Sequence, residues 1–335
     1  MSSSAKGPSL ADVAALAGVS ISTVSKVANG SADVGEDTRA RVTEILKGQQ
    51  YVSKRKRSTT PTITLLVRSM TIPSTAEIMR GALAEAQQRG ARIALVQHGD
   101  DEPDEGWIDQ FTPRTTSAVI AIHSVLDSEQ QQRLESQGIQ LVVVNPKDAP
   151  NLGAYSIGAT NWAGGLTAAQ HLIGLGHRRI AMLCGDDDSM ISRARLSGYR
   201  EALEAAGLRI DADLVVPGHF TFESGLEQAR TVLRCTPRPT AIVAGSDEQA
   251  MGAIEAARLE GARVPEDVSI VGFDDLAVAS MTSPPLTSVR QPLEQMGVAA
   301  IGMALDLIER RDPRSHHTEL ATTLIERGST APPTD

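Results

Sequence analysis

Apolar residues near the amino terminus recur at intervals of three and four, the spacing that places them on one face of a helix. The two groups with this spacing are Leu10, Val13, Ala14 and Ala17, followed by Val42, Ile45 and Leu46. Gly18 and the Asn29-Gly30 pair interrupt the pattern, and the hydroxyls of Ser9 and Ser20 can cap the helices that follow them. Residues 8–52 are therefore predicted to form a small all-α domain in which three short helices share one core.

The pattern changes after residue 62, where short runs of β-branched residues alternate with helical spacing. The strand candidates are Ile63–Val67, Ile93–Val96, Ala118–Ile122, Leu141–Val144, Ile180–Leu183, Ala241–Ala244 and Ser269–Phe273. Alternation of this kind predicts parallel sheets covered by helices on both faces. So many strands exceed what one doubly wound domain usually holds, so we expect residues 62–335 to form an α/β core of two similar lobes.

A basic linker is predicted between the two parts, at residues 53–61. It contains Lys54-Arg55-Lys56-Arg57, four adjacent like charges that repel one another, and it ends at Pro61, which disfavours helix just before it. The whole chain has a net charge of −9, but residues 1–60 hold nine Lys and Arg against five Asp and Glu, while the remainder holds 23 against 36. A short basic arm on an acidic body indicates a nucleic-acid-binding module joined to a different kind of domain.

The segment 10–30 has the spacing of a helix-turn-helix, with Gly18 at the turn and a second helix that begins at Ser20. Such a second helix lies in the major groove of DNA, where hydroxyl, branched alkyl and ammonium groups can contact base edges. The side chains placed for this are those of Ile21, Ser22 and Lys26. The rest of the expected DNA-binding set, suited mainly to phosphates, is Ser9, Ser20, Thr23, Ser25, Asn29, Thr38, Lys54 and Arg55. The alternative is an ordinary helical hairpin with no role in DNA binding.

Polar residues follow directly after most of the predicted strands. In open parallel sheets a ligand lies beyond the carboxyl ends of the strands, so these positions are the first candidates for a binding site. They are Arg68-Ser69, Gln97-His98, His123-Ser124, Asn145, Gly185-Asp186, Ser246-Asp247 and Asp274-Asp275. Each can equally be a polar turn of an ordinary α/β protein.

The sequence lacks several motifs, and their absence narrows the classes of function that remain. Cys184 and Cys235 are the only cysteines, which leaves neither a disulfide framework nor a Cys-x-x-Cys site. No run approaches the roughly 18 apolar residues of a membrane span, and the Ser-rich start has no signal-peptide core, so we expect a cytoplasmic protein without membrane contact. The sequence also lacks the phosphate-binding, dinucleotide-binding, nucleophile-elbow and paired-histidine motifs of common α/β enzymes. We therefore expect no catalysis, cofactor or metal, with an α/β enzyme and a solute-binding transport protein as the alternatives.

The amino-terminal segment resembles the DNA-binding headpiece of the LacI/GalR family of bacterial repressors. That family shows the pattern D-V-A-x-x-A-G-V-S-x-x-T-V-S-[RK]-x-x-N-G, which is present here from Asp12 to Gly30. Further similar segments are Gly174–Ala181, Arg193–Tyr199, Val264–Asp275 and Pro284–Pro292. The resemblance implies a core like that of periplasmic binding proteins, with two lobes joined by three crossovers. It also implies a homodimer that binds double-stranded operator DNA and a small effector, and it leaves open whether two dimers form a tetramer.

The resemblance further implies where the lobes divide and which residues contact the effector. The expected first lobe is about residues 62–158 and 288–318, and the expected second lobe is about residues 159–287 and 319–335. The implied polar contacts are Arg195, Ser246 and Asp274, with Arg68, Ser69, Asn145, Trp162 and Phe220 as further candidates. Carboxylate, amide and guanidinium groups bond hydroxyls, and an aromatic ring can stack on a sugar. We expect a sugar that releases the protein from its operator, and a purine-type corepressor that promotes DNA binding is the alternative.

The linker departs from the pattern of the family it resembles. Members usually continue into a short hinge helix containing Ala-Arg-x-Leu, whose leucine enters the minor groove. The equivalent stretch here is Ser53–Thr60, with Thr60 near the leucine position and no apolar side chain to insert. We therefore expect this linker to bind DNA mainly through charge, which predicts a steep dependence of affinity on salt.

Overall fold

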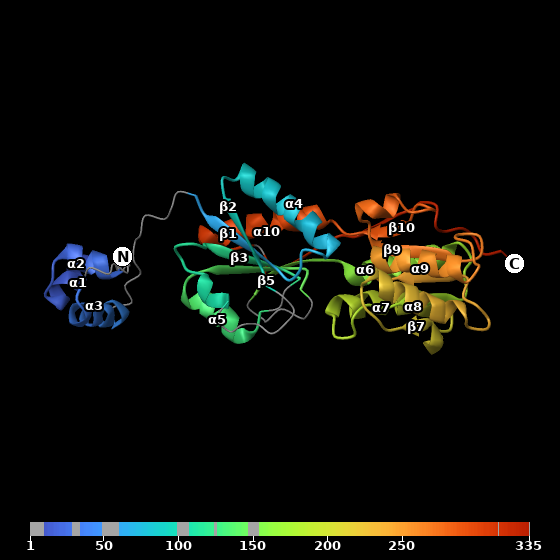
Figure 1. Ribbon diagram of the computed structural model, residues 1–335, viewed down its shortest axis with the longest axis horizontal. Helices are drawn as coiled ribbons and strands as arrows, with labels where there is room; N and C mark the ends of the chain where they lie inside the picture. The colour runs from blue at the N-terminus through green and yellow to red at the C-terminus, as the bar shows by residue number, and fades with distance from the viewer. Residues whose placement is uncertain are drawn as a thin grey trace, which may run out of the picture. The chain divides into compact units, whose positions relative to one another are not determined.

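The structure is a computed structural model, and it describes residues 10–28, 34–48, 60–98, 107–123, 126–146, 154–313 and 315–334. The chain divides into two compact units, residues 1–59 and 60–335 (Figure 1). Most of the linker expected at 53–61 lies outside the described residues, as do the expected DNA contacts Ser9, Asn29, Lys54 and Arg55.

The first unit is a three-helix headpiece. Its helices are α1 (Leu10–Ala17), α2 (Ile21–Ala28) and α3 (Glu36–Gly48). They share a small core of Val13, Ala14, Ala17, Val24 and Val42, which confirms the helical spacing of the sequence. Gly18 makes the turn with a φ of 62°, and the Ser20 hydroxyl accepts a hydrogen bond from the Thr23 backbone N–H at 3.1 Å, so Ser20 caps α2 as expected.

The first lobe of the second unit is built on a parallel six-stranded sheet with the order β11-β5-β4-β3-β1-β2. The strands are β1 (Thr62–Val67), β2 (Arg92–Gln97), β3 (Ala118–Ile122), β4 (Gln140–Val144), β5 (Tyr155–Ala159) and β11 (His317–Leu320). Helices α4 (Pro73–Gln88) and α10 (Leu293–Ile308) pack together over one face, whereas α5 (Ser128–Ser136) covers the other (Figure 1). The short η1 (Trp107–Gln110) packs beside α5 on that second face. Within β1, Leu65 and Leu66 therefore face different cores, as the two-residue period of a strand requires.

The second lobe repeats this architecture with the strand order β12-β10-β9-β8-β6-β7, in which the edge strand β12 is antiparallel. The strands are β6 (Ile180–Leu183), β7 (Val215–Val216), β8 (Ala241–Ala244), β9 (Ser269–Asp274), β10 (Thr287–Arg290) and β12 (Thr323–Ile325). The helices are α6 (Asn161–Gly174), α7 (Met190–Ala205), α8 (Phe222–Leu233) and α9 (Asp247–Leu259), with short turns η2 (Ala212–Leu214) and η3 (Ala277–Ser280). Pairs α6–α7 and α8–α9 cover opposite faces, so two doubly wound lobes are confirmed.

The chain passes between the two sheets three times: after β5, after β10 and after β11. The expected boundary at about 287/288 comes early, because β10 stays in the second sheet through Arg290, paired with β9. Val289 is buried in the second lobe's core, and Arg290 forms an ion pair with Asp275. The expected boundary at 318/319 was also early, since β11 continues in the first sheet to Leu320.

Two glycines allow helices α6 and α7 to cross in backbone contact. A Cβ atom at Gly165 would overlap the carbonyl oxygen of Arg195, and one at Gly198 would overlap that of Trp162. The close approach holds the backbone of α7 around Arg195 against α6. It therefore fixes the backbone position from which the Arg195 side chain extends.

Within the described residues, no single helix is long and apolar enough to cross a membrane. Helices α1 and α2 pass such a test only when taken together, although a bend of 100° separates them. Their apolar side chains form the headpiece core, which accounts for that composition.

Candidate effector site and DNA-reading helix

Arg195 is the centre of a buried polar cluster at the carboxyl ends of the second lobe's strands. Only 3% of the residue is exposed. Its Nε donates to Asn161 Oδ1 at 2.9 Å, a terminal nitrogen donates to the carbonyl oxygen of Gly245, and the other lies 3.5 Å from Asp274 Oδ1. Burial lowers the pKa of Arg195 to about 10, and the negative charges of Asp274 and Asp247 oppose that shift. The guanidinium is therefore cationic at neutral pH and fixed in direction. We call this cluster the Arg195 site.

Two aromatic rings flank the guanidinium group. Its central carbon lies 3.7 Å from the ring centroid of Phe273 and 5.4 Å from that of Phe220. Phe220 fits against backbone, because a Cβ atom at Gly185 would overlap the Phe220 ring and one at Gly245 would come within 3.0 Å of it. The structure thus brings the expected Phe220 beside Arg195, in reach of a cation–π contact.

Asp274 lies at the end of β9 with a φ of 115°, which is strained for a residue other than glycine. Gln291, in the crossover after β10, donates its Nε2 to Asp274 Oδ1 at 2.5 Å. Burial raises the pKa of Asp274, while the charge of Arg195 and the hydrogen bond from Gln291 act in the opposite direction. The Gln291 Oε1 atom is buried without a hydrogen-bond partner among the described residues. A ligand that brings a donor would satisfy it.

Asp247, a strand-end candidate that was not among the expected effector contacts, is fully buried at the start of α9. Its Oδ1 accepts from the Ser288 hydroxyl at 2.6 Å and its Oδ2 accepts from the Leu276 backbone N–H at 2.7 Å. Burial and the charge of Asp274 raise the pKa of Asp247 well above its ordinary value, although the hydrogen bonds from Ser288 and Leu276 oppose this. The position of the buried Asp247 carboxyl group thus depends on its two hydrogen-bond donors, Ser288 and Leu276.

His123 and Asn145 form the first lobe's part of the polar cluster, at the ends of the adjacent strands β3 and β4. Both have left-handed backbones, with φ values of 54° and 53°. The His123 Nε2 lies 3.0 Å from the Ser74 hydroxyl, and its Nδ1 lies 3.4 Å from the Asn145 side-chain nitrogen. Burial lowers the pKa of His123 to about 4, helped by the charges of Arg195 and Arg68 and opposed by a hydrogen bond with the Asn145 backbone. The imidazole is therefore neutral at physiological pH.

The structure does not gather all of the expected effector contacts. Arg68 is partly buried after β1, near enough for its charge to act on His123, whereas the Ser69 hydroxyl bonds locally to Thr71 at 2.8 Å. The Ser246 hydroxyl caps α9 by accepting from the Gln249 N–H at 3.1 Å. Trp162 is 47% exposed on α6 and takes no part in the contacts that join Arg195, Asp274 and Phe220.

His123 and Asp247 are two residues of the polar cluster that the expected effector contacts left out. Both belong to the polar pairs that follow predicted strands, so strand position was the available signal. Nothing in the residue types distinguished them from the other strand-end pairs. Their importance comes from burial, backbone conformation and partners that are distant in the sequence.

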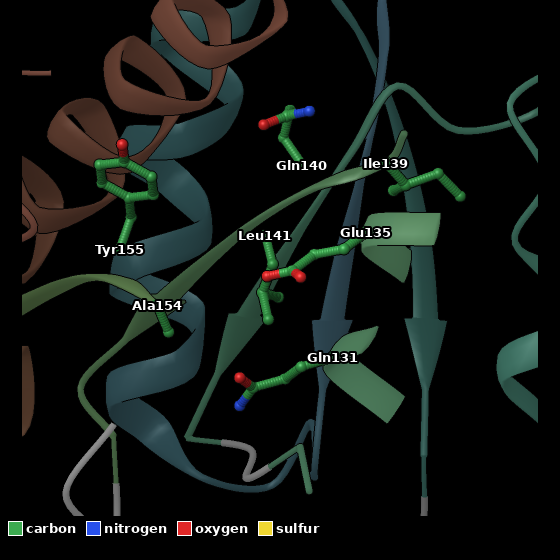
Figure 2. A pocket seen from close by; sticks show the side chains of 7 residues that line it. All are labelled: Gln131, Glu135, Ile139, Gln140, Leu141, Ala154 and Tyr155. Atoms are coloured by element: carbon green, nitrogen blue, oxygen red, sulfur yellow. The ribbon is translucent and has the colours of Figure 1, made fainter. Parts of the chain in front are cut away.

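A cavity of about 150 Å³ lies elsewhere in the first lobe, at the amino-terminal ends of β4 and β5 (Figure 2). Its lining residues are Gln131, Glu135, Ile139, Gln140, Leu141, Ala154 and Tyr155. Because the strands are parallel, this edge of the sheet is opposite the edge that carries His123 and Asn145. The cavity therefore does not belong to the Arg195 site.

In the headpiece, α2 presents a polar face with one apolar side chain. Ile21, Ser22 and Lys26 are exposed, whereas Val24 is buried in the core. The Ser20 hydroxyl lies 2.7 Å from that of Ser22 and 2.8 Å from that of Thr23, so these groups bond to one another in the absence of DNA. The other phosphate candidates with described positions, Ser25 and Thr38, are partly exposed. The expected base-contacting side chains thus lie on the solvent side of α2.

The comparisons with known proteins agree with this arrangement. Residues 9–54 match the family described as bacterial regulatory proteins, lacI family, and residues 169–330 match a periplasmic binding protein-like domain. The chain is 35% identical over 333 residues to the HTH-type transcriptional regulator CelR of Thermobifida fusca, covering 96% of this chain and 98% of that protein. It is 33% identical over 326 residues to the ribose operon repressor of Escherichia coli (strain K12), covering 95% and 98%.

Solved structures show the same likeness. A complex of the transcriptional regulator CelR with cellobiose has a TM-score of 0.74 and 36% identity, covering 96% of this chain and 99% of that one. The lac repressor dimer bound to operator and the anti-inducer ONPF has a TM-score of 0.72 and 25% identity, covering 97% and 100%. These relatives are transcriptional regulators and not enzymes. Since two relatives exceed 30% identity over nearly the whole chain, and the headpiece matches the family itself, the chain belongs to the lacI family of bacterial regulatory proteins.

Proposed function

We propose that this protein is a dimeric, cytoplasmic repressor that a neutral sugar releases from its operator. The observation that carries the proposal is the presence in one chain of a helix whose exposed side chains Ile21, Ser22 and Lys26 suit base edges, and of a core with the Arg195–Asp274 pair. A similar structure holds cellobiose, and another is a dimer on operator DNA. This chain is proposed to share both properties, the binding of a sugar and the binding of operator DNA as a dimer.

DNA recognition is assigned to α2. Ser22 and Ile21 would read base edges, and Lys26 would contact a guanine or a phosphate. The hydroxyls of Ser20, Thr23, Ser25 and Thr38 would bond phosphates, which fix the position of the helix and not its sequence preference. We assign further phosphate contacts to Ser9 and Asn29, and charge-driven contacts to the basic linker with Lys54 and Arg55.

The effector is assigned to the Arg195 site because of its balance of charge and hydrogen bonds. Arg195 is paired with Asp274 at 3.5 Å, and the charge of Asp247 also acts on it, so an anionic effector would have to compete with Asp274 for the guanidinium. The acceptors Asp274 Oδ1 and Gln291 Oε1 call for a ligand rich in donors. A neutral polyol meets both conditions, with Phe220 against one face of the sugar and Ser246 at its edge. From the first lobe, Asn145, Arg68 and Ser69 complete the proposed contacts, and Trp162 would join them only by a change of rotamer.

Release from DNA follows from linkage. An effector that binds one arrangement of the lobes more tightly shifts the protein toward it, by no more than the difference between the two affinities. A sugar that prefers the arrangement with weaker DNA binding acts as an inducer. The second candidate is a purine corepressor, because the chain is also 33% identical over 327 residues to the HTH-type transcriptional repressor PurR of Pectobacterium atrosepticum.

For the dimer we propose a surface with exposed apolar side chains. Leu83 on α4 and Leu95 on β2 are exposed in the first lobe, and Leu259 and Met281 are exposed in the second. Exposed large apolar side chains are covered when a second copy packs over them, and large apolar patches mark such interfaces. A second copy of this chain is the proposed partner, in keeping with the dimer of the similar lac repressor structure.

The test starts with genomic fragments selected on the immobilised protein, followed by fluorescence anisotropy with the selected duplex. Cellobiose, ribose, glucose 6-phosphate and hypoxanthine are then added in turn. A neutral sugar should weaken operator binding by about tenfold or more, and Asp274→Ala should abolish that response while the protein stays folded. An increase of affinity with hypoxanthine would favour the corepressor. Lack of preference for any fragment over random duplex would overturn the proposal.

A further inference from the structure

The segment from Leu276 to Ala279 joins the cores of the two lobes. The Leu276 side chain, 7% exposed, belongs to the apolar cluster of the first lobe together with Leu293 and Met296 of α10. Val278 packs against the same cluster. Ala279 lies instead in the second lobe's cluster, beneath α9. A few consecutive residues therefore contact both cores, and they begin two positions after Asp274.

The turn before Leu276 is held in an unusual conformation. Asp274 and Asp275 have φ values of 115° and 55°, so two successive residues lie in the region that favours glycine. Such conformations persist only where the surroundings determine them, and they concentrate at functional sites. Asp275 is fixed by ion pairs with Arg290 at 2.7 Å and Arg327 at 2.6 Å, both in or beside the second lobe's sheet.

Asp247 connects this turn to the second lobe through both carboxylate oxygens. Oδ2 accepts from the Leu276 N–H at 2.7 Å, and Oδ1 accepts from the Ser288 hydroxyl at 2.6 Å. The Ser288 oxygen in turn accepts from the Asp275 N–H at 3.1 Å. Asp247 itself is 0% exposed, so a bound effector does not reach it. The backbone of the turn is thus held by the second lobe while the Leu276 side chain is held by the first.

We propose that Asp247 is a positioning residue, which holds the turn 274–276 so that occupancy of the Arg195 site is transmitted through Leu276 to the first lobe. The first lobe begins at β1, directly after the linker from the headpiece, so it is the lobe that the DNA-binding domain is joined to. The proposal rests on the proposed function, in which the effector contacts Asp274. A shift of Asp274 on binding moves the next peptide groups, and the Leu276 side chain moves within the packing of α10.

The test compares Leu276→Ala with Leu305→Ala. Leu305 is 4% exposed and belongs to the same first-lobe cluster, but it lies in α10 away from the turn, so it controls for loss of apolar packing. The readout is the ratio of operator affinities without and with saturating cellobiose, measured beside the affinity for cellobiose itself. Leu276→Ala should lower the ratio at least tenfold and change cellobiose affinity less than threefold. Leu305→Ala should leave the ratio unchanged.

Asp247→Asn is the second variant, because the amide keeps the shape of the side chain and replaces one acceptor by a donor. It should lower the same ratio, and a ratio within twofold of wild type in both Asp247→Asn and Leu276→Ala would overturn the inference. Failure of the proposed function is recognised separately. In that case Asp274→Ala would bind cellobiose as tightly as wild type does, or wild type would not bind it.

If cellobiose does not bind at the Arg195 site, a measurement without any effector still tests the inference. The chain has two tryptophans, Trp107 in η1 of the first lobe and Trp162 in α6 of the second. Trp162→Phe and Trp107→Phe backgrounds therefore report the urea unfolding of each lobe by fluorescence. The two midpoints should coincide in these backgrounds and with Leu305→Ala, and they should separate with Leu276→Ala or Asp247→Asn. Coincident midpoints in the latter two variants would contradict transmission through the turn.

Discussion

Acidification should destabilise the core through His123. Burial and two nearby arginines lower the pKa of this imidazole from 6.5 to about 4. The unfolded chain therefore binds a proton between these two values while the folded chain does not, so the free energy of unfolding falls as the pH is lowered through this window. For these pKa values the loss from about pH 7 to about pH 5 is roughly 1.8 kcal/mol from this one residue.

The assay is urea unfolding of the full chain at both pH values, in wild type and in His123→Gln. Glutamine does not titrate and can still bond the Ser74 hydroxyl, which His123 Nε2 approaches at 3.0 Å. His171 and His177 also have pKa values lowered by burial, and they contribute equally to both proteins. The difference between the two proteins in their loss of stability therefore isolates His123.

Wild type should lose about 1.8 kcal/mol more than His123→Gln over this interval. An NMR titration of the His123 ring protons gives the pKa itself. If the two proteins lose stability in parallel and the resonance titrates near 6.5, then the imidazole is not held between Ser74, Asn145 and the two arginines as described.

Three further predictions concern packing, DNA reading and assembly. Gly198→Ala should lower the free energy of unfolding by about 1–3 kcal/mol, because its Cβ would overlap a backbone carbonyl of α6 that cannot turn aside. In differential scanning calorimetry Gly302→Ala is the matched control, and with nothing within 4 Å of its Cβ it should instead stabilise α10 by about 0.5–1 kcal/mol. Ser22→Ala should alter the base preferred at one operator position by about 1–3 kcal/mol, as selection from a random duplex library would show, with cellobiose affinity unchanged. Leu83→Glu should weaken dimerisation in sedimentation equilibrium, whereas Leu16→Glu in the headpiece should not; a fully dimeric Leu83→Glu would exclude α4 from the interface.

The parts of the fold that could be predicted are those governed by local pattern. The headpiece follows from helical spacing, the φ of 62° at Gly18 and the cap at Ser20, all of which involve neighbours in the sequence. The alternation of strands and helices likewise predicted two doubly wound lobes. The expected lobe boundary near β10 lies three residues before the strand ends, because Arg290 at that end is held by an ion pair with Asp275, which follows the neighbouring strand β9.

The residues of the Arg195 site could be predicted only in part from local sequence pattern. Trp162 was chosen because an aromatic ring can stack on a sugar, but the preceding residue, Asn161, already points inward to bond Arg195. Successive residues of a helix differ by about 100°, so Trp162 points away from its neighbour and toward solvent. Asn161 has no motif of its own and could be found only after Arg195 had been placed beside it.

The same reasoning explains why Asp274 was among the expected effector contacts and Asp247 was not. An aspartate after a strand usually caps the next helix, and the residue type alone cannot show that this carboxyl group is fully buried. Its value depends on Ser288 and Leu276, donors that approach from a different strand and from a turn held by two positive φ angles. Removal of either donor would leave a buried carboxylate short of a hydrogen bond, which is costlier than the bond itself is favourable. Residues that bind a ligand can be recognised in a sequence from the chemistry of their side chains. Residues that position others can be recognised only when the packing around them is known.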